Sequence, residues 1–269
     1  WIPANFVWFG GDKLTQGMLD RAANYQAPNG GMVYFVATDE HVDPYLSAYT
    51  AIAFHWLKAD GYTIPPNVES KLHDYLLNFL RQDAAPDFYQ EGMKSTVRAV
   101  ALAALAAEGK IKADDVQRYR PHLKQMSLFG KAHFLQAALT FKETKDAAKE
   151  SADMIFATGS ETGGKFLFNE VLDDGYLRIL ATPLRDNCAV LSSFLAYKKT
   201  ASGAELIGDK PFKLVRAITQ SRGARDHWEN TQENMFCTAA LIDYARAYET
   251  VKPDMKVSAK LDGVEFGTA

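Results

Sequence analysis

The sequence predicts an all-α protein, an α/α toroid of helical hairpins, with a short β-hairpin at its C-terminus. The first observation is a recurring unit in which a polar amphipathic helix, a loop and a more apolar helix follow one another. The second is its period of about fifty residues, which is typical of helical repeat arrays and closed toroids. The third is the stretch 255–266, which alternates apolar and polar residues as strands do.

The apolar helix of each unit is expected in an inner layer and its amphipathic partner in an outer layer. The inner helices are predicted at 45–58, 97–107, 127–141, 185–197 and from Asn230 to Tyr248. The outer helices are predicted at 12–26, 67–81, 112–124, 144–157 and 210–221. The alanine-rich run at 97–107 has little side-chain bulk, so neighbouring helices can approach it closely at the middle of a ring.

The last unit carries the clearest helix signals. Asn230 can cap the helix that follows, with Glu233 reaching back from the third helical position as in a capping box. Two sides of this helix are apolar. One side carries Cys237, Ala240, Leu241, Tyr244, Ala245 and Tyr248, and the other carries Met235, Ala239 and Ile242. A helix that is apolar on two sides is expected to be packed on two sides.

Two other segments have local signals. Asp43 precedes Pro44, and proline is favoured at the first helical position behind such a cap. The longest irregular stretch, 157–183, holds the apolar patches 166–168 and 177–181, which we expect to form a short hairpin or a capping loop. Long ordered loops often carry function.

The chain is expected to contain one domain and the start of another. Pro253 marks a boundary, and Asp262-Gly263 is a two-residue hairpin turn between alternating segments. We therefore predict a helical domain over 1–251 and the first strands of a β domain over 252–269.

Composition excludes several classes of protein. Thirty basic and 33 acidic residues give a net charge of −3, which provides no electrostatic footprint for nucleic acid. The sequence has no apolar run of the roughly 18 residues that span a membrane. It also lacks a signal peptide and begins at Trp1 without an initiator methionine, so we interpret it as a fragment of a larger protein.

The residues that carry chemistry form no recognisable active site. No pair among the six histidines has the spacing of a zinc-binding helix, so we predict no metal and no cofactor. Asp173-Asp174 could act as an acid/base pair, but adjacent acids in a loop are more often solvated. Cys188 and Cys237 are interpreted as two small buried hydrophobic residues, because spacing alone does not establish a disulfide. No catalytic residue is assigned.

Several segments, taken in order, resemble the thioester domain of bacterial alpha-2-macroglobulins. They are 43–49 (Asp-Pro-Tyr-Leu-Ser-Ala-Tyr), 126–132, 173–176, 228–234 (Trp-Glu-Asn-Thr-Gln-Glu-Asn) and the exit 248–254 before strands with Leu261-Asp-Gly263. The resemblance covers most of the chain. It marks nine positions as family-motif residues with a structural role: Asp43, Pro44, Tyr45, Trp228, Asn230, Thr231, Gln232, Glu233 and Asn234.

This resemblance implies a ring of six hairpins, of which five are present and the first is missing. The family carries its Cys-x-x-Gln thioester motif in that first hairpin, and neither Cys188 nor Cys237 is followed by Glu-Gln. It also implies a broad-spectrum protease inhibitor that traps proteases, a non-enzymatic role, neighbouring β domains, and a periplasmic parent anchored by lipid. Loss of one hairpin would expose the inner faces of its two neighbours, through which the fragment could dimerise.

Two other functions are consistent with the sequence. One is an α/α-toroid enzyme of the terpene-cyclase or polysaccharide-acting kind, although the chain has only Asp173-Asp174 where cyclases carry Asp-x-Asp-Asp. The other is a helical-repeat binding module whose concave surface is the functional part. A large central cavity with converging acids would favour the enzyme, whereas a centre filled by side chains would favour the inhibitor scaffold.

Overall fold

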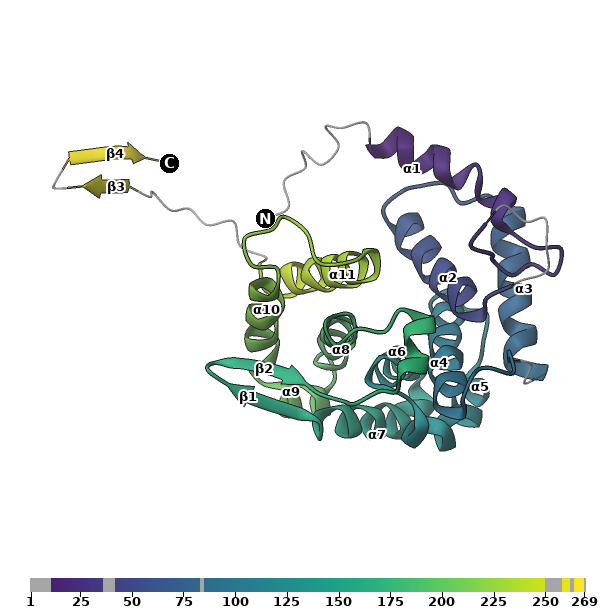
Figure 1. Ribbon diagram of the computed structural model, residues 1–269. Helices are drawn as coiled ribbons and strands as arrows, with labels where there is room; N and C mark the ends of the chain where they lie inside the picture. Colours follow the sequence, from purple (N-terminus) through teal and green to yellow (C-terminus); the bar gives the residue numbers. More distant parts are fainter. Residues whose placement is uncertain (1–10, 36–41, 83–84, 250–257, 262–263, 269) are drawn as a thin grey trace.

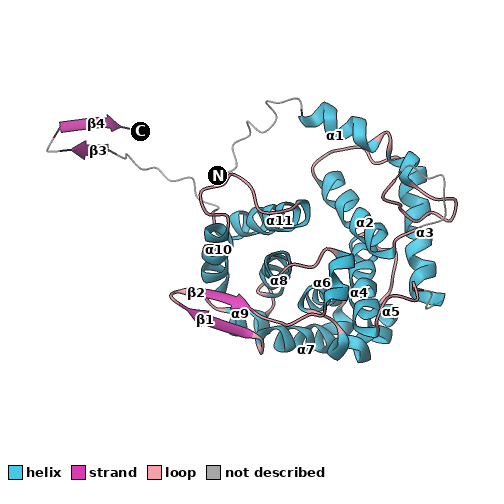
Figure 2. Ribbon diagram, viewed as in Figure 1, coloured by secondary structure: helices cyan, strands magenta, loops and turns pink. Residues whose placement is uncertain are grey.

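The computed structural model describes residues 11–35, 42–82 and 85–249, together with two strands at 258–261 and 264–268. In the helical part, two concentric layers of helices form an incomplete ring (Figure 1). Coloured by secondary structure, the ring is almost entirely helical, as the sequence predicts (Figure 2). The predicted turn at Asp262-Gly263 lies outside the described residues.

The inner layer consists of the five helices predicted from their apolar character. They are α2 (Pro44–Ala59), α4 (Glu91–Ala107), α6 (Leu128–Leu139), α8 (Pro183–Tyr197) and α11 (Thr231–Tyr248). Neighbours pack in the order α2, α4, α6, α8, α11. In α4 every residue from Ser95 to Ala106 is buried, because its alanines let the flanking helices approach on all sides.

The outer layer consists of amphipathic segments, each preceding its inner partner in sequence. They are α1 (Gly11–Leu19) with η2 (Ala22–Tyr25), α3 (Pro66–Gln82), α5 (Ala113–Tyr119) with η3 (Arg120–Gln125), η4 (Lys142–Thr144) with α7 (Lys145–Phe156), and α10 (Lys210–Ser221). In α3 the residues Val68, Leu72, Leu76 and Phe79 form the buried stripe. The five expected hairpins are therefore present in the described part of the chain.

Helix α4 begins at Glu91, earlier than the predicted Val97. Its first turns are polar in sequence, so the apolar pattern predicts only the part of the helix from Val97 onward. Gly92 lies within the helix, and a larger residue would not fit there because a Cβ would lie 2.7 Å from Tyr176 Oη and 2.9 Å from the Gln125 carbonyl oxygen. The glycine that signals a loop locally is thus required by tertiary packing.

The long irregular stretch contains both a hairpin and a helical turn. Strands β1 (Gly159–Thr162) and β2 (Lys165–Phe168) pair antiparallel, and Gly163 and Gly164 both adopt positive φ in the turn between them. The second apolar patch is not a strand but part of the 3-10 helix η5 (Asp174–Ile179). A further short helix, α9 (Ala201–Ile207), was not predicted.

The C-terminal strands β3 (Ser258–Leu261) and β4 (Val264–Thr268) pair antiparallel, as the alternating pattern predicts. The proposed boundary at 251/252 lies outside the described residues. Among the described helices, none has the length and apolar content needed to cross a lipid bilayer.

The second apolar side of helix α11 is only partly covered, contrary to the prediction that the helix packs on both apolar sides. Its first apolar side faces α8 and includes Cys237 and Ala240, which are fully buried. Its second side, formed by Met235, Ala239 and Ile242, lines an open groove against α2. The prediction was wrong because periodicity shows which faces are apolar but not whether a neighbour is present to cover them.

Candidate functional site

A fully buried arginine connects the first turns of the inner helices. Arg185, in the first turn of α8, is 0% exposed. Its Nε donates to Asp186 Oδ1 at 2.8 Å, and its Nη1 donates to the Ile179 carbonyl oxygen of η5. The guanidinium also lies 3.9 Å from the centre of the Phe129 ring of α6, a favourable cation–π arrangement. One side chain therefore contacts α6, α8 and η5.

The same arginine links the first and last inner helices. Arg185 Nη1 donates to Tyr45 Oη of α2 at 3.1 Å, and Tyr45 Oη donates to Gln232 Oε1 of α11 at 2.5 Å. Both Tyr45 and Gln232 are buried. Two of the residues singled out by the resemblance, 187 positions apart, are thus brought together by a residue that sequence analysis did not select.

Two carboxyl groups lie beside this arginine. Asp186 is 2% exposed and hydrogen-bonds to Glu170. Glu170 Oε1 also accepts from the Leu128 amide at the start of α6, at 2.8 Å. Burial, and then the Asp186 charge, raise the pKa of Glu170 to about 7, while the hydrogen bond from the Leu128 amide and the charges of Lys131 and Arg185 oppose the rise. Burial also raises the pKa of Asp186, but its ion pair with Arg185 and its hydrogen bond with Glu170 oppose that rise, so of the two carboxyl groups Glu170 is the one expected to hold a proton.

Replacing Glu170 with glutamine is expected to weaken the pH dependence of stability. The pKa of Glu170 is about 7 in the folded chain, against 4.5 for an ordinary glutamate. Between these two pH values the folded chain therefore holds a proton that the unfolded chain has released. Its stabilising contribution is complete below pH 4.5 and is lost as pH rises through 7. Urea denaturation at pH 5 and pH 8 should show that the free energy of unfolding of E170Q falls less between the two pH values than that of wild type.

The control for this experiment is Glu205→Gln, because Glu205 is exposed on α9. This variant should show the same difference in the free energy of unfolding between pH 5 and pH 8 as wild type. Equal pH dependence in wild type and E170Q would contradict the assignment of the buried proton to Glu170.

The start of α11 is held by reciprocal hydrogen bonds. The Asn230 side chain accepts from the Glu233 amide at 3.0 Å and caps the helix as predicted. Glu233 reaches back, but to the amide of Glu229 rather than to that of Asn230, at 3.0 Å. Its other oxygen accepts from the Thr182 hydroxyl at 2.8 Å, so this carboxylate also ties α11 to the N-cap of α8.

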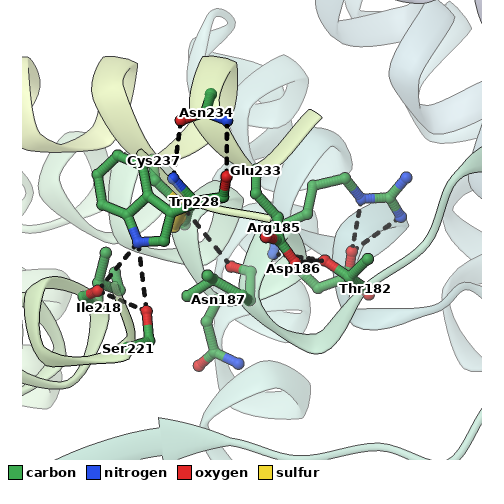
Figure 3. The surroundings of a disulfide bond; sticks show 12 residues. Thr182, Arg185, Asp186, Asn187, Ile218, Ser221, Trp228, Glu233, Asn234 and Cys237 are labelled. Atoms are coloured by element: carbon green, nitrogen blue, oxygen red, sulfur yellow. Dashed lines mark hydrogen bonds and ion pairs between the residues drawn. A yellow bond between two sulfur atoms is a disulfide. The ribbon is translucent and has the colours of Figure 1, made fainter. Parts of the chain in front are cut away.

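Trp228 and Asn234 hold the turn before α11 against the outer layer (Figure 3). The Trp228 backbone amide donates to Asn234 Oδ1 at 3.0 Å, and Asn234 Nδ2 donates to the Trp228 carbonyl oxygen at 3.2 Å. The indole nitrogen donates to the Ile218 carbonyl oxygen of α10 at 3.2 Å. Thr231, the first residue of α11, is exposed.

Replacing Asn230 with alanine is expected to destabilise the folded chain by about 1 kcal/mol, because the cap of α11 is lost. Asn230→Asp keeps an acceptor in the same place and should cost much less. Thermal denaturation of the two variants would measure the difference. Equal destabilisation by both substitutions would contradict a capping role.

The two cysteines form a disulfide, which corrects the interpretation of two separate thiols. Cys188 of α8 and Cys237 of α11 are bonded to each other, and both are fully buried (Figure 3). The prediction that they are buried in inner helices was right. The bond was not predicted because the residues are 49 positions apart and only the packing of α8 on α11 brings them together.

The residues at the start of α2 have comparable roles. Asp43 caps the helix by accepting from the Leu46 amide at 2.8 Å, and Pro44 occupies the first helical position, as predicted. Burial raises the pKa of Asp43, and its hydrogen bonds with backbone amides and Tyr89 oppose this rise. In the long loop, Asp173 caps η5, and both Asp173 and Asp174 are exposed.

The centre of the ring is filled by aromatic side chains. Phe129 and Phe236 pack edge to face with ring centres 5.0 Å apart, and the ring centres of His133 and Phe129 are 4.3 Å apart. Burial lowers the pKa of His133 to about 4, so it is neutral at physiological pH. The hollow left at the other end of the inner helices measures about 210 Å³, and Asp243 is the one acid lining it among the described residues.

The described residues contain no cluster of histidine, cysteine or acidic side chains able to hold a metal ion. The geometry is therefore that of a two-layered helical ring whose polar residues connect helices to one another. The helix caps were predicted correctly, but the role of Arg185 was not predicted, although a charged Arg185-Asp186 pair at the start of an apolar helix indicates a buried ion pair.

Comparison with known proteins identifies this fold. No protein-family model and no curated protein matches the chain. Among solved structures, Salmonella alpha-2-macroglobulin reacted with methylamine matches 88% of the chain with a TM-score of 0.66 and 18% identity. The native conformation of Escherichia coli alpha-2-macroglobulin matches 93% with a TM-score of 0.67 and 18% identity.

A third structure, native Escherichia coli alpha-2-macroglobulin from domain MG7 to the C-terminus, matches 96% of the chain with a TM-score of 0.67 and 18% identity. The chain has the fold of a region of bacterial alpha-2-macroglobulins, which confirms the expected resemblance at the level of fold. It covers only 14% of each of the first two structures and 37% of the third.

Proposed function

We propose that this chain is the helical ring domain of a bacterial alpha-2-macroglobulin-like protease trap and that it acts as a scaffold rather than an enzyme. The observation that carries the proposal is the match of almost the whole helical ring to alpha-2-macroglobulins. The matched structures include Escherichia coli alpha-2-macroglobulin activated by trypsin and by porcine elastase, each with a TM-score of 0.63 and 18% identity. In the proposed parent, neighbouring β domains would surround this ring.

The disulfide indicates what part of the function this chain can supply. A thioester needs a cysteine sulfur bonded to an acyl carbon, and both cysteines of the sequence are occupied by the bond between Cys188 and Cys237. Within these 269 residues the proposed role is therefore to position and support neighbouring parts of the trap.

Treating the native, unreduced chain with methylamine is expected to produce no adduct, because it holds no thioester and no free thiol among its described residues. Intact-mass spectrometry after incubation is the measurement. A thioester-containing alpha-2-macroglobulin treated in parallel serves as the positive control. A stable methylamine adduct on a glutamine side chain of this chain would contradict the proposal.

The trap itself is tested on the longest natural protein that contains this chain. After incubation with trypsin or elastase, the protease should elute with this protein in size-exclusion chromatography. Its hydrolysis of a large protein substrate should fall, while hydrolysis of a small peptide continues, because a trap excludes substrates by size. Protease with its active-site serine chemically blocked is the control, and it should not be captured.

Equal loss of activity on large and small substrates would indicate an inhibitor that blocks the active site and would contradict trapping. Full activity on both substrates, with no co-elution, would contradict any inhibitory role.

We also propose a periplasmic location, with lipid anchoring of the parent inferred from the resemblance alone. The buried disulfide supports the location, since such bonds persist in oxidising compartments and are rare in the cytosol. Alkylation of thiols in the protein isolated from its native cells, followed by mass spectrometry, should find Cys188 and Cys237 protected.

The filled centre argues against the enzyme alternative. A cyclase needs a cavity that holds its substrate against acidic residues, whereas aromatic side chains occupy the middle of this ring. The acids beside Arg185 line a separate pocket of about 330 Å³ under the loop 169–182.

A further inference from the structure

We propose that protonated Glu170 holds the segment 170–173 over the pocket beside Asp186, and that the segment is released when Glu170 loses its proton. This segment joins strand β2 to the 3-10 helix η5. The pocket beneath it measures about 330 Å³, and every residue of the segment lines it. The inference is independent of the protease-trap proposal, since it concerns one loop of the ring.

Both ends of this segment are fixed to their neighbours. At the end next to β2, the Asn169 side chain donates to the Ser160 hydroxyl of β1 at 2.8 Å. At the end next to η5, Tyr176 and Ile179 are buried, and the Ile179 carbonyl oxygen accepts a hydrogen bond from α8. A movement confined to 170–173 therefore leaves β2 and η5 in place.

Glu170 attaches the segment to two inner helices. Its Oε1 accepts from the Leu128 amide in the first turn of α6 at 2.8 Å, and its carboxyl group hydrogen-bonds to Asp186 in the first turn of α8. The next residue, Val171, is fully exposed, and Leu172 is only partly buried. A hydrogen bond between two carboxyl groups requires a proton on one of them. The contact with α8 therefore depends on that proton.

Charged and titratable groups from three elements face Glu170. Asp186 and Arg185 belong to α8, Lys131 to α6 and Tyr176 to η5. Arg185 is paired with Asp186, and Lys131 donates to a backbone carbonyl oxygen just before α6, so both cations already have partners. Burial and the Asp186 charge outweigh these cations, and the pKa of Glu170 is about 7. The charge of Glu170 therefore changes near neutral pH.

Loss of the proton turns the contact between Glu170 and Asp186 into a repulsion. Two carboxylates then face each other away from bulk water, where like charges repel more strongly. Movement of Glu170 into solvent relieves this repulsion and carries the segment 170–173 with it. The hydrogen bond from the Leu128 amide opposes release, but it favours the carboxylate less than burial disfavours it.

The two pKa values limit the size of the effect. The pKa of Glu170 is about 7 in the closed segment, against 4.5 for an ordinary glutamate in solvent. By linkage, deprotonation favours release by at most about 300-fold.

Hydrogen–deuterium exchange in the 269-residue chain tests the proposal. Wild type is compared with Glu170→Gln at the same pH, so that the intrinsic exchange rates match. Glutamine keeps an acceptor for the Leu128 amide and a donor toward Asp186, and it has no proton to lose at these pH values. At pH 8 we expect the amides of Leu128 and 171–173 to exchange at least about tenfold faster in wild type. At pH 5 the ratio should be less than about fivefold.

Two comparisons separate local release from other effects. Asp174→Asn removes an exposed carboxylate next to the same segment and should exchange like wild type at both pH values. Low concentrations of urea should leave the exchange of 171–173 at pH 8 unchanged, because local release exposes little surface, but should accelerate exchange in the buried helix α4. Circular dichroism verifies that each variant keeps its helical content.

Three results would overturn the proposal. The first is equal exchange of these amides in wild type and Glu170→Gln at pH 8. The second is the same urea dependence for 171–173 as for α4, which would show that the segment is released only when the whole ring unfolds. The third is slowed exchange in Asp174→Asn equal to that in Glu170→Gln, which would show that any acid of this loop has the same effect.

Discussion

Replacing Arg185 with alanine is expected to lower the free energy of unfolding by about 3–5 kcal/mol, as removal of one partner from a buried ion pair does. The substitution leaves Asp186 charged and buried without its counter-ion. It also removes the donor to Tyr45 and to the Ile179 carbonyl oxygen. Urea denaturation followed by circular dichroism measures the change.

Two further variants separate the role of the ion pair from a general effect of losing arginine. Arg216→Ala removes an exposed arginine from α10 and should change stability by less than about 0.5 kcal/mol. Arg185→Met combined with Asp186→Leu removes both buried charges and should recover part of the loss, because no unpaired charge remains. If the double variant is less stable than Arg185→Ala, the buried charge of Asp186 is not the cause.

Replacing both Cys188 and Cys237 with alanine is expected to cost about 4 kcal/mol, the chain-entropy value for a loop of 49 residues. The bond fixes the last inner helix, α11, to α8, so its loss lets the unfolded chain explore more conformations. Denaturation of wild type with and without a thiol reductant measures the effect directly.

The reductant should have no effect on the double alanine variant, which is the control. Alkylation should verify that the reductant has freed both thiols of wild type. If the denaturation midpoint of this reduced protein is unchanged, the bond has no stabilising role.

Local signals predict most of this fold. Hydrophobic periodicity identifies the inner and outer helices, since a helix buried on several sides and a helix buried on one side differ in how far their apolar residues extend around the axis. The caps at Asp43 and Asn230 were predictable because a cap depends on residues three positions apart.

The contacts that connect the helices could not be predicted from the sequence. The Cys188–Cys237 bond and the contacts of Arg185 join segments that are distant in sequence, and their geometry depends on how complete helices pack. The same is true of the start of α4, where Gly92 is required by Tyr176 from another part of the chain. No local pattern contains that information.

The hydrogen bond between Tyr45 and Gln232 has a consequence for the order of folding. It joins residues 187 positions apart, whereas each hairpin forms contacts between helices that are adjacent in sequence. Because closing a long stretch of chain costs more entropy than forming a local hairpin, the hairpins should form first. Contact between α2 and α11 should then develop in the slowest phase of refolding, after most of the helical signal has returned.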